Sequence, residues 1–381
     1  MIIIVEPVRL GLEHQAFNAA LIQAAVEAFP GQEIQFWADQ SHLDSIAEML
    51  GSAHGVRLVA VAIAPRRASL WQRVGPDSRL ARQALQLARE PGNRLVFSSI
   101  TIPLLWACRL QMLAKPSHQV GAVLHGGLAE LRWRPKFNLW KRWTGLRWAL
   151  SHSPRWLTFW ALEQSIASAL QRFAPELAAR FGVFPHPLPP DLSMVASHQP
   201  PVAPLAIGLL GLATPQKGLL RFLAVAQELH RVAAFRLVGR VHQDWRERVA
   251  DQLAVLDLKP EAAPMARALF VSRVRELTYA AFFFEGEHYA LTASGVLLDC
   301  IALGIPLLGR RHPLFSELEA EVGEIGHFCE AGEEVQMVAE LVANFDPARH
   351  AAQCAAMRRL RHQRSVAALA ERIDQLLSVR Q

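Results

Sequence analysis

Residues 289–309, "YALTASGVLLDCIALGIPLLG", carry the pattern that decides the fold. Just before them, residues 280–284 ("AAFFF") have the composition of a buried strand. Apolar residues then recur at helical spacing over residues 295–303, with Ser294 as the expected N-cap and Gly304 just past the expected C-terminus. Because "IPLLG" follows as a second short strand, the order is strand, loop, helix, strand. That order predicts a parallel sheet.

The pair Ser294 and Gly295 is expected at the C-terminal edge of that sheet, where the helix begins. A helix start exposes unpaired N–H groups and the positive end of the helix dipole, and a glycine lets an anion approach the backbone closely. The pair is therefore a candidate phosphate site. On this fragment alone, ordinary capping of the helix is the simpler explanation.

Length and composition leave room for two or three domains with sizeable cores, because the chain has 381 residues, of which 51% are hydrophobic. The four cysteines are far apart in no metal-ligand spacing, so neither a disulfide nor a zinc site is expected. The start "MIIIVEP" lacks the charged region of a signal peptide, and we expect a cytoplasmic protein. A net charge of +6 indicates an anionic partner: a membrane surface, nucleic acid or a phosphorylated substrate.

Strand-like and helical runs alternate over residues 1–192, which is typical of a doubly wound α/β domain. A helix is expected over 166–181, and the proline-rich "FPHPLPPD" ends the region. Residues 193–204 then have the composition of a linker. The last part of the chain, about 362–381, is expected to form a helix that packs back on this first domain.

A second alternation over residues 205–361 predicts a second Rossmann-like domain. It begins with the strand "LAIGLLG" and a helix over 218–230. The strand "AAFRLVG" follows, with a helix over 244–256 and a short strand "RALFVS" at 267–272. The unit at 289–309 completes the pattern, so the architecture repeats although the sequence does not.

Three motifs resemble the GT-B glycosyltransferases, in particular the large retaining, nucleotide-sugar-dependent family known as glycosyltransferase family 4. They are "LLGLATPQKGLLRFLAVAQEL" at 209–229, "SGVLLDCIALGIPLLG" at 294–309, and the pair "VLHGG" and "FPHPLPPD" in the first half. The resemblance covers most of the chain, and its motifs are most specific in the second half. It implies two Rossmann-like domains that face a cleft, with the nucleotide-sugar donor on the second domain.

The resemblance also assigns donor-side residues. Lys217 and Gly218 match a Lys-Gly pair that contacts the donor diphosphate, Ser294 and Gly295 match the phosphate-binding helix start, and Asp299 matches an acidic residue near the nucleotide ribose. Two departures accompany these matches. Leu291 stands where the family commonly has a first carboxylate, and the usual arginine beside the Lys-Gly pair is absent. Arg240, which follows a strand end, is the expected substitute, with Arg310 and Arg311 as alternatives.

Candidate catalytic residues lie near the expected C-terminal ends of strands in both domains. His125 in "LHGG" ends a buried strand and is expected in the cleft, although a satisfied core histidine is the alternative. Glu285 and Glu287 lie in the loop before the helix start and are candidates to replace the missing carboxylate; solvated surface glutamates are the alternative. Glu13 and His14 begin the first helix and are acceptor-side candidates for a general base, with capping as the alternative.

Residues 132–160 are basic and rich in tryptophan: they contain seven Arg or Lys, no Asp or Glu, and six of the ten tryptophans. Leu139, Trp143, Leu146 and Leu150 recur at helical spacing, with basic residues such as Arg147 off that stripe. The segment is typical of an anionic membrane interface. Base stacking in a nucleic-acid groove and a helix packed on the sheet are the alternatives, and we expect no nucleic acid.

The sequence thus predicts a glycosyltransferase that moves a sugar from a nucleoside diphosphate donor to a glycan or lipid-linked acceptor in surface polysaccharide or glycolipid synthesis. It is expected in the cytoplasm, peripheral at the inner face of the membrane. The nucleotide sugar is a co-substrate, and no cofactor and no metal are expected. A sugar-nucleotide epimerase on the same fold, or a catalytically silent nucleotide-sugar-binding protein, is the alternative.

Overall fold

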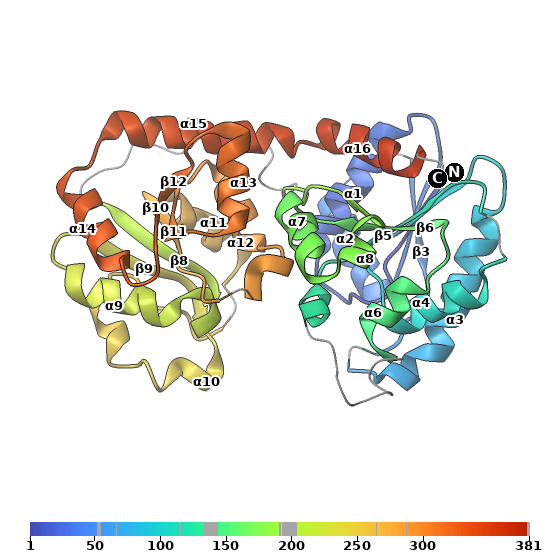
Figure 1. Cartoon of the computed structure of the whole chain (residues 1–381), viewed down its shortest axis with the longest axis horizontal. Coiled ribbons are helices and arrows are strands. Elements are labelled where there is room, and N and C mark those ends of the chain that lie inside the picture. Colours follow the sequence, from blue (N-terminus) through green and yellow to red (C-terminus); the bar gives the residue numbers. More distant parts are fainter. Residues whose placement is uncertain are drawn as a thin grey trace. The chain divides into compact units, whose positions relative to one another are not determined.

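The computed structural model of the chain consists of two compact units, which we call unit 1 and unit 2 (Figure 1). Unit 1 contains Met1–Asp191, Leu291–Ala293 and Arg364–Gln381, and unit 2 contains Leu192–Ala290 and Ser294–Gln363. The structure describes residues 1–51, 55–65, 67–113, 116–132, 144–189, 192, 204–263, 265–286 and 288–378. The last segment of the chain therefore belongs to the same unit as the first.

Unit 1 is built on a seven-stranded parallel sheet of order β3-β2-β1-β4-β5-β6-β7. The strands are β1 (Ile2–Val5), β2 (Ile34–Ala38), β3 (Val56–Ala60), β4 (Arg94–Phe97), β5 (Val120–Val123), β6 (Leu157–Ala161) and β7 (Phe181–Val183). In the centre, β1 pairs with β2 and β4, and all four of its side chains are buried. A run of four apolar residues fits this place because helices cover a parallel sheet on both faces.

Helices follow most of these strands and enclose the unit 1 core. They are α1 (Gln15–Ala28), α2 (Gln40–Leu50), α3 (Leu70–Ala88), α4 (Ile102–Leu110), η1 (Leu128–Arg132), α6 (Leu146–Ser151), α7 (Gln164–Phe173), α8 (Pro175–Ala178) and the C-terminal α16 (Val366–Ser378). Helix α16 packs against α1, and its buried residues Leu369, Ile373 and Leu377 join the unit 1 core.

Unit 2 is built on a five-stranded parallel sheet of order β12-β11-β10-β8-β9. The strands are β8 (Ala206–Ala213), β9 (Ala234–Val241), β10 (Tyr279–Phe282), β11 (Leu307–Arg310) and β12 (Gly326–Cys329). The helices are η3 (Pro215–Lys217), α9 (Leu219–Leu229), α10 (Gln243–Arg246), η4 (Gln252–Val255), α11 (Arg267–Arg275), η5 (His288–Leu291), α12 (Gly295–Leu303), α13 (Pro313–Val322), α14 (Glu334–Ala343) and α15 (Pro347–Gln363).

Most predicted elements are present, and the helix expected over 295–303 has the observed bounds of α12. Three expectations were wrong. The helix over 166–181 breaks at Pro175 into α7 and α8, and Phe181 begins β7. Residues 267–272 are helical rather than a strand: α11 has Val274 as its fully buried residue, whereas a strand within a parallel sheet is buried on both faces.

The third wrong expectation is the continuous helix over 244–256, which the structure replaces by α10, a series of turns and η4. The apolar spacing still identified the buried side, since Val249 is in the unit 2 core and Trp245 and Leu253 pack against it. Bonds from the Val249 amide to the Trp245 carbonyl and from the Leu253 amide to the Val249 carbonyl keep helical turns there. The pattern indicated the face and not the length of regular helix.

Candidate functional site

In unit 2, the loops that contain the predicted donor residues leave the same edge of the sheet. Strands β8, β10 and β11 are parallel neighbours, so their C-terminal ends lie side by side. Lys217 follows β8, Glu285 follows β10, and the start of α12 lies between β10 and β11. Ligands of open α/β sheets bind at this kind of edge.

The loop after β8 is seated directly on the end of β10. Gly218 has φ 86°, and a Cβ atom built on it would lie 2.3 Å from the carbonyl oxygen of Phe283, so only glycine fits. The amide of Glu285 donates to the carbonyl of Gln216 at 3.0 Å. The Thr214 side chain caps the short helix η3 by accepting from the amide of Lys217 at 3.3 Å. These contacts fix the position of the loop that carries Lys217.

The side chain of Lys217 is half-buried, and burial lowers the pKa of its ammonium group. Among the described residues, no carboxylate forms an ion pair with it. Desolvating a charge without a partner is unfavourable, so this site favours an anionic ligand beside the ammonium. Arg221, in the first turn of α9, contacts the Glu285 carboxylate at 3.6 Å.

Helix α12 starts at Gly295, and Ser294 occupies the N-cap position as predicted. Its hydroxyl makes no capping hydrogen bond, so the pair is not explained by side-chain capping. A Cβ on Gly295 would meet nothing within 4 Å, which leaves open space at the helix start. The next residue, Val296, lies against β8: a Cβ on Gly211 would be 2.9 Å from its Cγ1. This contact brings the α12 start to the end of the strand that leads to Lys217.

Asp299, the predicted ribose ligand, is buried on α12 and already has a protein partner. Its carboxylate accepts a hydrogen bond from Arg267 of α11 at 2.7 Å, and the Arg267 side chain is 42% exposed. Arg267 was not singled out from the sequence, because its segment was expected to be a strand. The available signal was a basic residue, Arg267, in the second domain that resembles the donor domain.

The three arginines expected to replace the missing charge differ in their partners. Arg310 pairs with Glu334 in a buried ion pair, and Arg311 contacts Glu330 at 3.2 Å. Arg240 lies exposed near the end of the edge strand β9, and no ion pair joins it to another described residue. Arg240 remains a prediction as a diphosphate contact. Glu287 lies outside the described residues.

In unit 1, the predicted histidines lie in a cluster with a third histidine that the sequence reasoning missed. The rings of His14 and His125 have centroids 4.5 Å apart, those of His125 and His186 6.3 Å, and Phe17 contacts both His125 and His186. His186 belongs to "FPHPLPPD", a motif interpreted as a breaker and as part of the resemblance to GT-B enzymes, with no role assigned to its histidine. A histidine among prolines at a domain boundary was the available signal.

Burial keeps this histidine cluster neutral. It lowers the pKa of His14 to about 3 and that of His186 to about 4, and it places the pKa of His125 well below its usual value. His125 donates from Nε2 to the carbonyl of Ser98 at 2.8 Å, so it carries its proton on that nitrogen. The buried Nδ1 of His14 has no hydrogen-bond partner among the described residues. His14 also has φ 56°, a conformation that is uncommon for residues other than glycine.

A buried carboxylate, Glu6, organises the backbone that leads to His14. Glu6 follows β1 and is fully buried. Its Oε1 accepts from the amides of Val8 and Arg9, at 2.9 and 3.1 Å. Its Oε2 accepts from the Ser98 and Ser99 hydroxyls at 3.0 and 2.8 Å and from Asn18. Glu13, in contrast, lies 4.0 Å from Arg9 in a partly exposed ion pair on the same loop.

No protein-family model matches the sequence, and no curated protein matches it. Solved structures match it over almost the whole chain. HepE of Anabaena, in complex with UDP and glucose, is 14% identical, with a TM-score of 0.66 and a coverage of 98% of both chains. The lipopolysaccharide outer core galactosyltransferase WaaB is 12% identical, with a TM-score of 0.64 and the same coverage. A glycosyltransferase from Rickettsia africae is 11% identical, with a TM-score of 0.69, covering 98% of this chain and 96% of that one.

The chain has the GT-B fold. The predicted fold class, α/β with two Rossmann-like domains, is therefore confirmed. In the GT-B architecture seen here, each sheet carries its candidate residues in loops after the C-terminal ends of strands. The roles assigned to these residues remain predictions.

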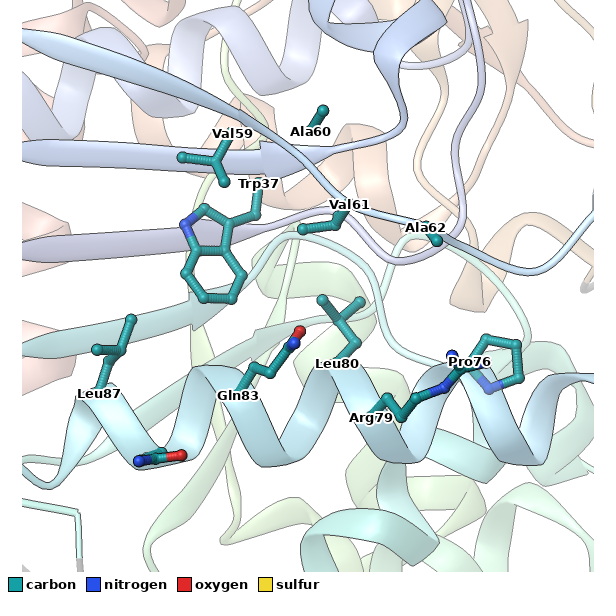
Figure 2. Close-up of a pocket in the computed structure, with 11 residues that line it drawn as sticks. Trp37, Val59, Ala60, Val61, Ala62, Pro76, Arg79, Leu80, Gln83 and Leu87 are labelled. Atoms are coloured by element: carbon teal, nitrogen blue, oxygen red, sulfur yellow. The ribbon is translucent and has the colours of Figure 1, made fainter.

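A pocket of about 570 Å³ opens in unit 1 between the ends of β2 and β3 and one face of α3. Figure 2 shows Leu80, Gln83 and Leu87 of α3 directed toward Trp37 and Val61. The indole N–H of Trp37 donates to the side-chain oxygen of Gln35 at 3.0 Å. Since this polar group is already bonded, Trp37 lines the pocket with the apolar part of its ring. The pocket is lined by Trp37, Val59, Ala60, Val61, Ala62, Pro76, Arg79, Leu80, Gln83, Gln86 and Leu87.

The basic, Trp-rich segment 132–160 is only partly within the described residues, since 133–143 lie outside them. In the described part, the predicted apolar stripe faces the protein interior: Leu146 and Leu150 of α6 are buried in the unit 1 core. Arg147 pairs with Glu176 and donates to the carbonyls of Leu131 and Phe173. For these residues the packed-helix alternative holds, which corrects the expectation that Arg147 faces a membrane.

Two structural features are absent from the described residues. No helix there is long and apolar enough to cross a bilayer. No group of three or more His, Cys, Asp or Glu side chains there could hold a metal ion. Cys108, Cys300, Cys329 and Cys354 are buried and free.

Proposed function

We propose that the protein is a glycosyltransferase that transfers a sugar from a nucleoside diphosphate sugar to a glycan or lipid-linked acceptor. The observation that carries the proposal is the half-buried ammonium of Lys217, which faces no described carboxylate and lies on the same sheet edge as the open start of α12. A diphosphate matches this arrangement, because it is an anion that a lysine and helix N–H groups bind together. The solved GT-B proteins in complex with UDP or UDP-glucose support a nucleotide-sugar ligand.

In this proposal the unit 2 residues act mainly on the leaving group. As the bond between the sugar and the diphosphate breaks, negative charge grows on the phosphate oxygens. Lys217 and the α12 amides are positioned beforehand, so they stabilise that charge without reorganisation. Arg240 adds a further positive charge at the same sheet, and Asp299 binds the ribose. The resemblance to the retaining family is the ground for proposing transfer with retention.

The acceptor side is proposed for unit 1. His125 and His14 are neutral, and a neutral imidazole can accept a proton or a hydrogen bond from an acceptor hydroxyl. The pocket combines the ring of Trp37 with the polar side chains of Arg79 and Gln83, which suits a sugar that carries an anionic group. We assign this pocket to the distal part of the acceptor.

We place the protein in the cytoplasm at the inner face of the membrane, in surface polysaccharide or glycolipid synthesis. A lipid-linked acceptor requires such a place, and the net charge of +6 favours an anionic surface. Two parts of the segment 132–160 remain in this proposal. They are residues 133–143, which the structure does not describe, and exposed positions such as Arg155.

A second candidate, a nucleotide-sugar-binding protein without catalysis, is favoured by one observation. Leu291, at the position of the missing carboxylate, is buried in an apolar core. Of the two candidate replacements, Glu285 is paired with Arg221. A protein of this kind binds the donor and leaves it intact.

The deciding experiment incubates the protein with a panel of nucleotide sugars, beginning with UDP-glucose, with and without a membrane lipid extract. Release of nucleoside diphosphate that rises with the extract is expected. Conversion of the donor into its epimer would instead identify an epimerase. Tight binding of the donor with neither product would identify the silent binding protein and overturn the enzyme proposal.

A further inference from the structure

Unit 1 exposes a group of large apolar side chains at the end of α4, which the proposed function does not use. Leu110 is 84% exposed, Met112 58% and Leu113 87%, and Trp71 at the start of α3 is 59% exposed. Large apolar side chains gathered on a surface mark a binding site, whereas single exposed ones need no explanation.

These side chains form one surface across α3, α4 and the loop after α4. Helices α3 and α4 pack on each other (Figure 1), and the rings of Trp71 and Trp106 have centroids 6.1 Å apart. Trp106 and Leu110 are one helical turn apart on α4, so they share a side of that helix. The indole of Trp156 donates to the carbonyl of Met112 at 3.4 Å, which adds a third tryptophan beside the exposed loop.

The helices that carry and border this surface are strongly basic. Helices α3 and α4 contain four arginines, Arg73, Arg79, Arg82 and Arg109. Their single carboxylate, Asp77, is buried and accepts a hydrogen bond from Thr101 at 2.5 Å. Arg109 precedes the exposed leucine and lies over the ring of Trp148, with 4.8 Å from its guanidinium carbon to the ring centroid. The surface therefore combines aliphatic tips, tryptophans and arginines.

We propose that this surface, defined by Trp71, Trp106, Arg109, Leu110, Met112 and Leu113, binds anionic phospholipid membranes. Leu110, Met112 and Leu113 enter the acyl region, the tryptophans lie at the headgroup level, and the arginines contact the anionic headgroups. Nucleic acid is the less suitable partner, because its bases stack on rings and the most exposed side chains here are aliphatic.

The inference is independent of the donor site, which lies on unit 2. Because Leu146 and Leu150 of α6 are buried, we assign the membrane contact to the exposed side chains at the end of α4 instead. It also gives a reason for the nearly complete exposure of Leu110 and Leu113.

The test measures cosedimentation of the full chain with phosphatidylcholine vesicles, with and without phosphatidylglycerol. The wild type is expected to bind the vesicles that contain phosphatidylglycerol, and less so as salt increases. Leu110→Ser/Leu113→Ser is expected to lower the partition coefficient about tenfold or more, since each leucine loses its transfer into the apolar layer. Trp71→Ser supplies an independent variant with a smaller loss in the same direction.

The matched control is Val232→Ser, which removes a 53% exposed apolar side chain from unit 2 and is expected to leave vesicle binding unchanged. Unchanged binding in the double leucine variant, or an equal loss in the Val232 variant, would overturn the proposal. So would retention of single-stranded RNA by a wild type that ignores vesicles. Titration with UDP separates the two proposals: all three variants should bind UDP as the wild type does, and a wild type that binds vesicles but no UDP contradicts only the donor site.

Discussion

Arg267 holds the carboxylate of Asp299 at 2.7 Å, and the two partners are unequally exposed: 42% of the Arg267 side chain is accessible but only 8% of that of Asp299. This asymmetry separates a structural role of the pair from a role in ligand binding. Removing the arginine leaves a buried charge without this partner, whereas removing the aspartate charge leaves a cation that water can reach.

Arg267→Ala is therefore expected to lower the free energy of unfolding by about 1–3 kcal/mol, and Asp299→Asn by less. The order is expected to reverse for UDP, because the carboxylate is the proposed acceptor of the ribose hydroxyl. Chemical denaturation and calorimetric titration of both variants test this. If Asp299→Asn binds UDP as tightly as the wild type, Asp299 serves only to hold Arg267.

Lys217→Ala and Ser294→Ala compare the two parts of the proposed diphosphate site. Lys217 supplies a charge-assisted contact, worth roughly 1.5–3 kcal/mol, and Ser294 at most a neutral hydrogen bond of about 1 kcal/mol. Because the Ser294 hydroxyl does not cap α12, its removal is expected to leave stability unchanged. Both losses should appear in calorimetric titration with UDP and be nearly absent with uridine. An unchanged affinity of Lys217→Ala for UDP would sink the donor-site proposal.

Gly218→Ala tests whether the Lys217 loop must sit directly on β10. The substitution places a methyl group 2.3 Å from the Phe283 carbonyl oxygen. It also forces an alanine to adopt φ 86°, which is unfavourable for residues other than glycine. Gly286→Ala is the matched control: it has φ 63° in the same unit, with open space around its Cβ. We expect the control to lose only the backbone cost of about 1–2 kcal/mol, and Gly218→Ala to lose more and to weaken UDP binding. Equal losses in thermal unfolding would show that the contact can relax.

The histidine cluster predicts a stability that falls in acid. His14 is neutral in the folded chain down to about pH 3, whereas the unfolded chain binds a proton near pH 6.5. The unfolded state thus binds more protons below pH 6.5, and stability is lost as the pH falls through that window. His14→Asn, an exchange that suits a positive φ, should reduce the slope by at most about 1.4 kcal/mol per pH unit.

Denaturant midpoints of the wild type and His14→Asn between pH 5 and pH 8 check this expectation. The two proteins should differ in slope below pH 6.5, and their slopes should agree near pH 8, where the histidine is neutral in both states. Parallel profiles over the whole range would mean that His14 binds its proton at the same pH in the folded and the unfolded chain. That outcome would contradict the lowering of its pKa by burial.

Local patterns in the sequence determined the elements and the repeated architecture. Apolar runs of four or five residues, such as residues 2–5 and 280–284, predict buried strands, and the helical spacing over 295–303 agrees with α12 at both ends. Breakers such as Gly304 then mark where the helix stops. These features depend on contacts within a few residues, and periodicity reports such contacts directly.

Only the tertiary structure decided the partners of the candidate residues. The pairing of β1 with β4, and of β4 with β5, brings the segment around His14 to His125, and a later segment adds His186. Asp299 is hydrogen-bonded to Arg267, which begins a helix in a segment that was expected to be a strand. Similarly, Leu150 is buried and Leu113 exposed, although both are leucines in basic surroundings. Strand order and packing set these contacts between distant segments, and no local periodicity encodes them.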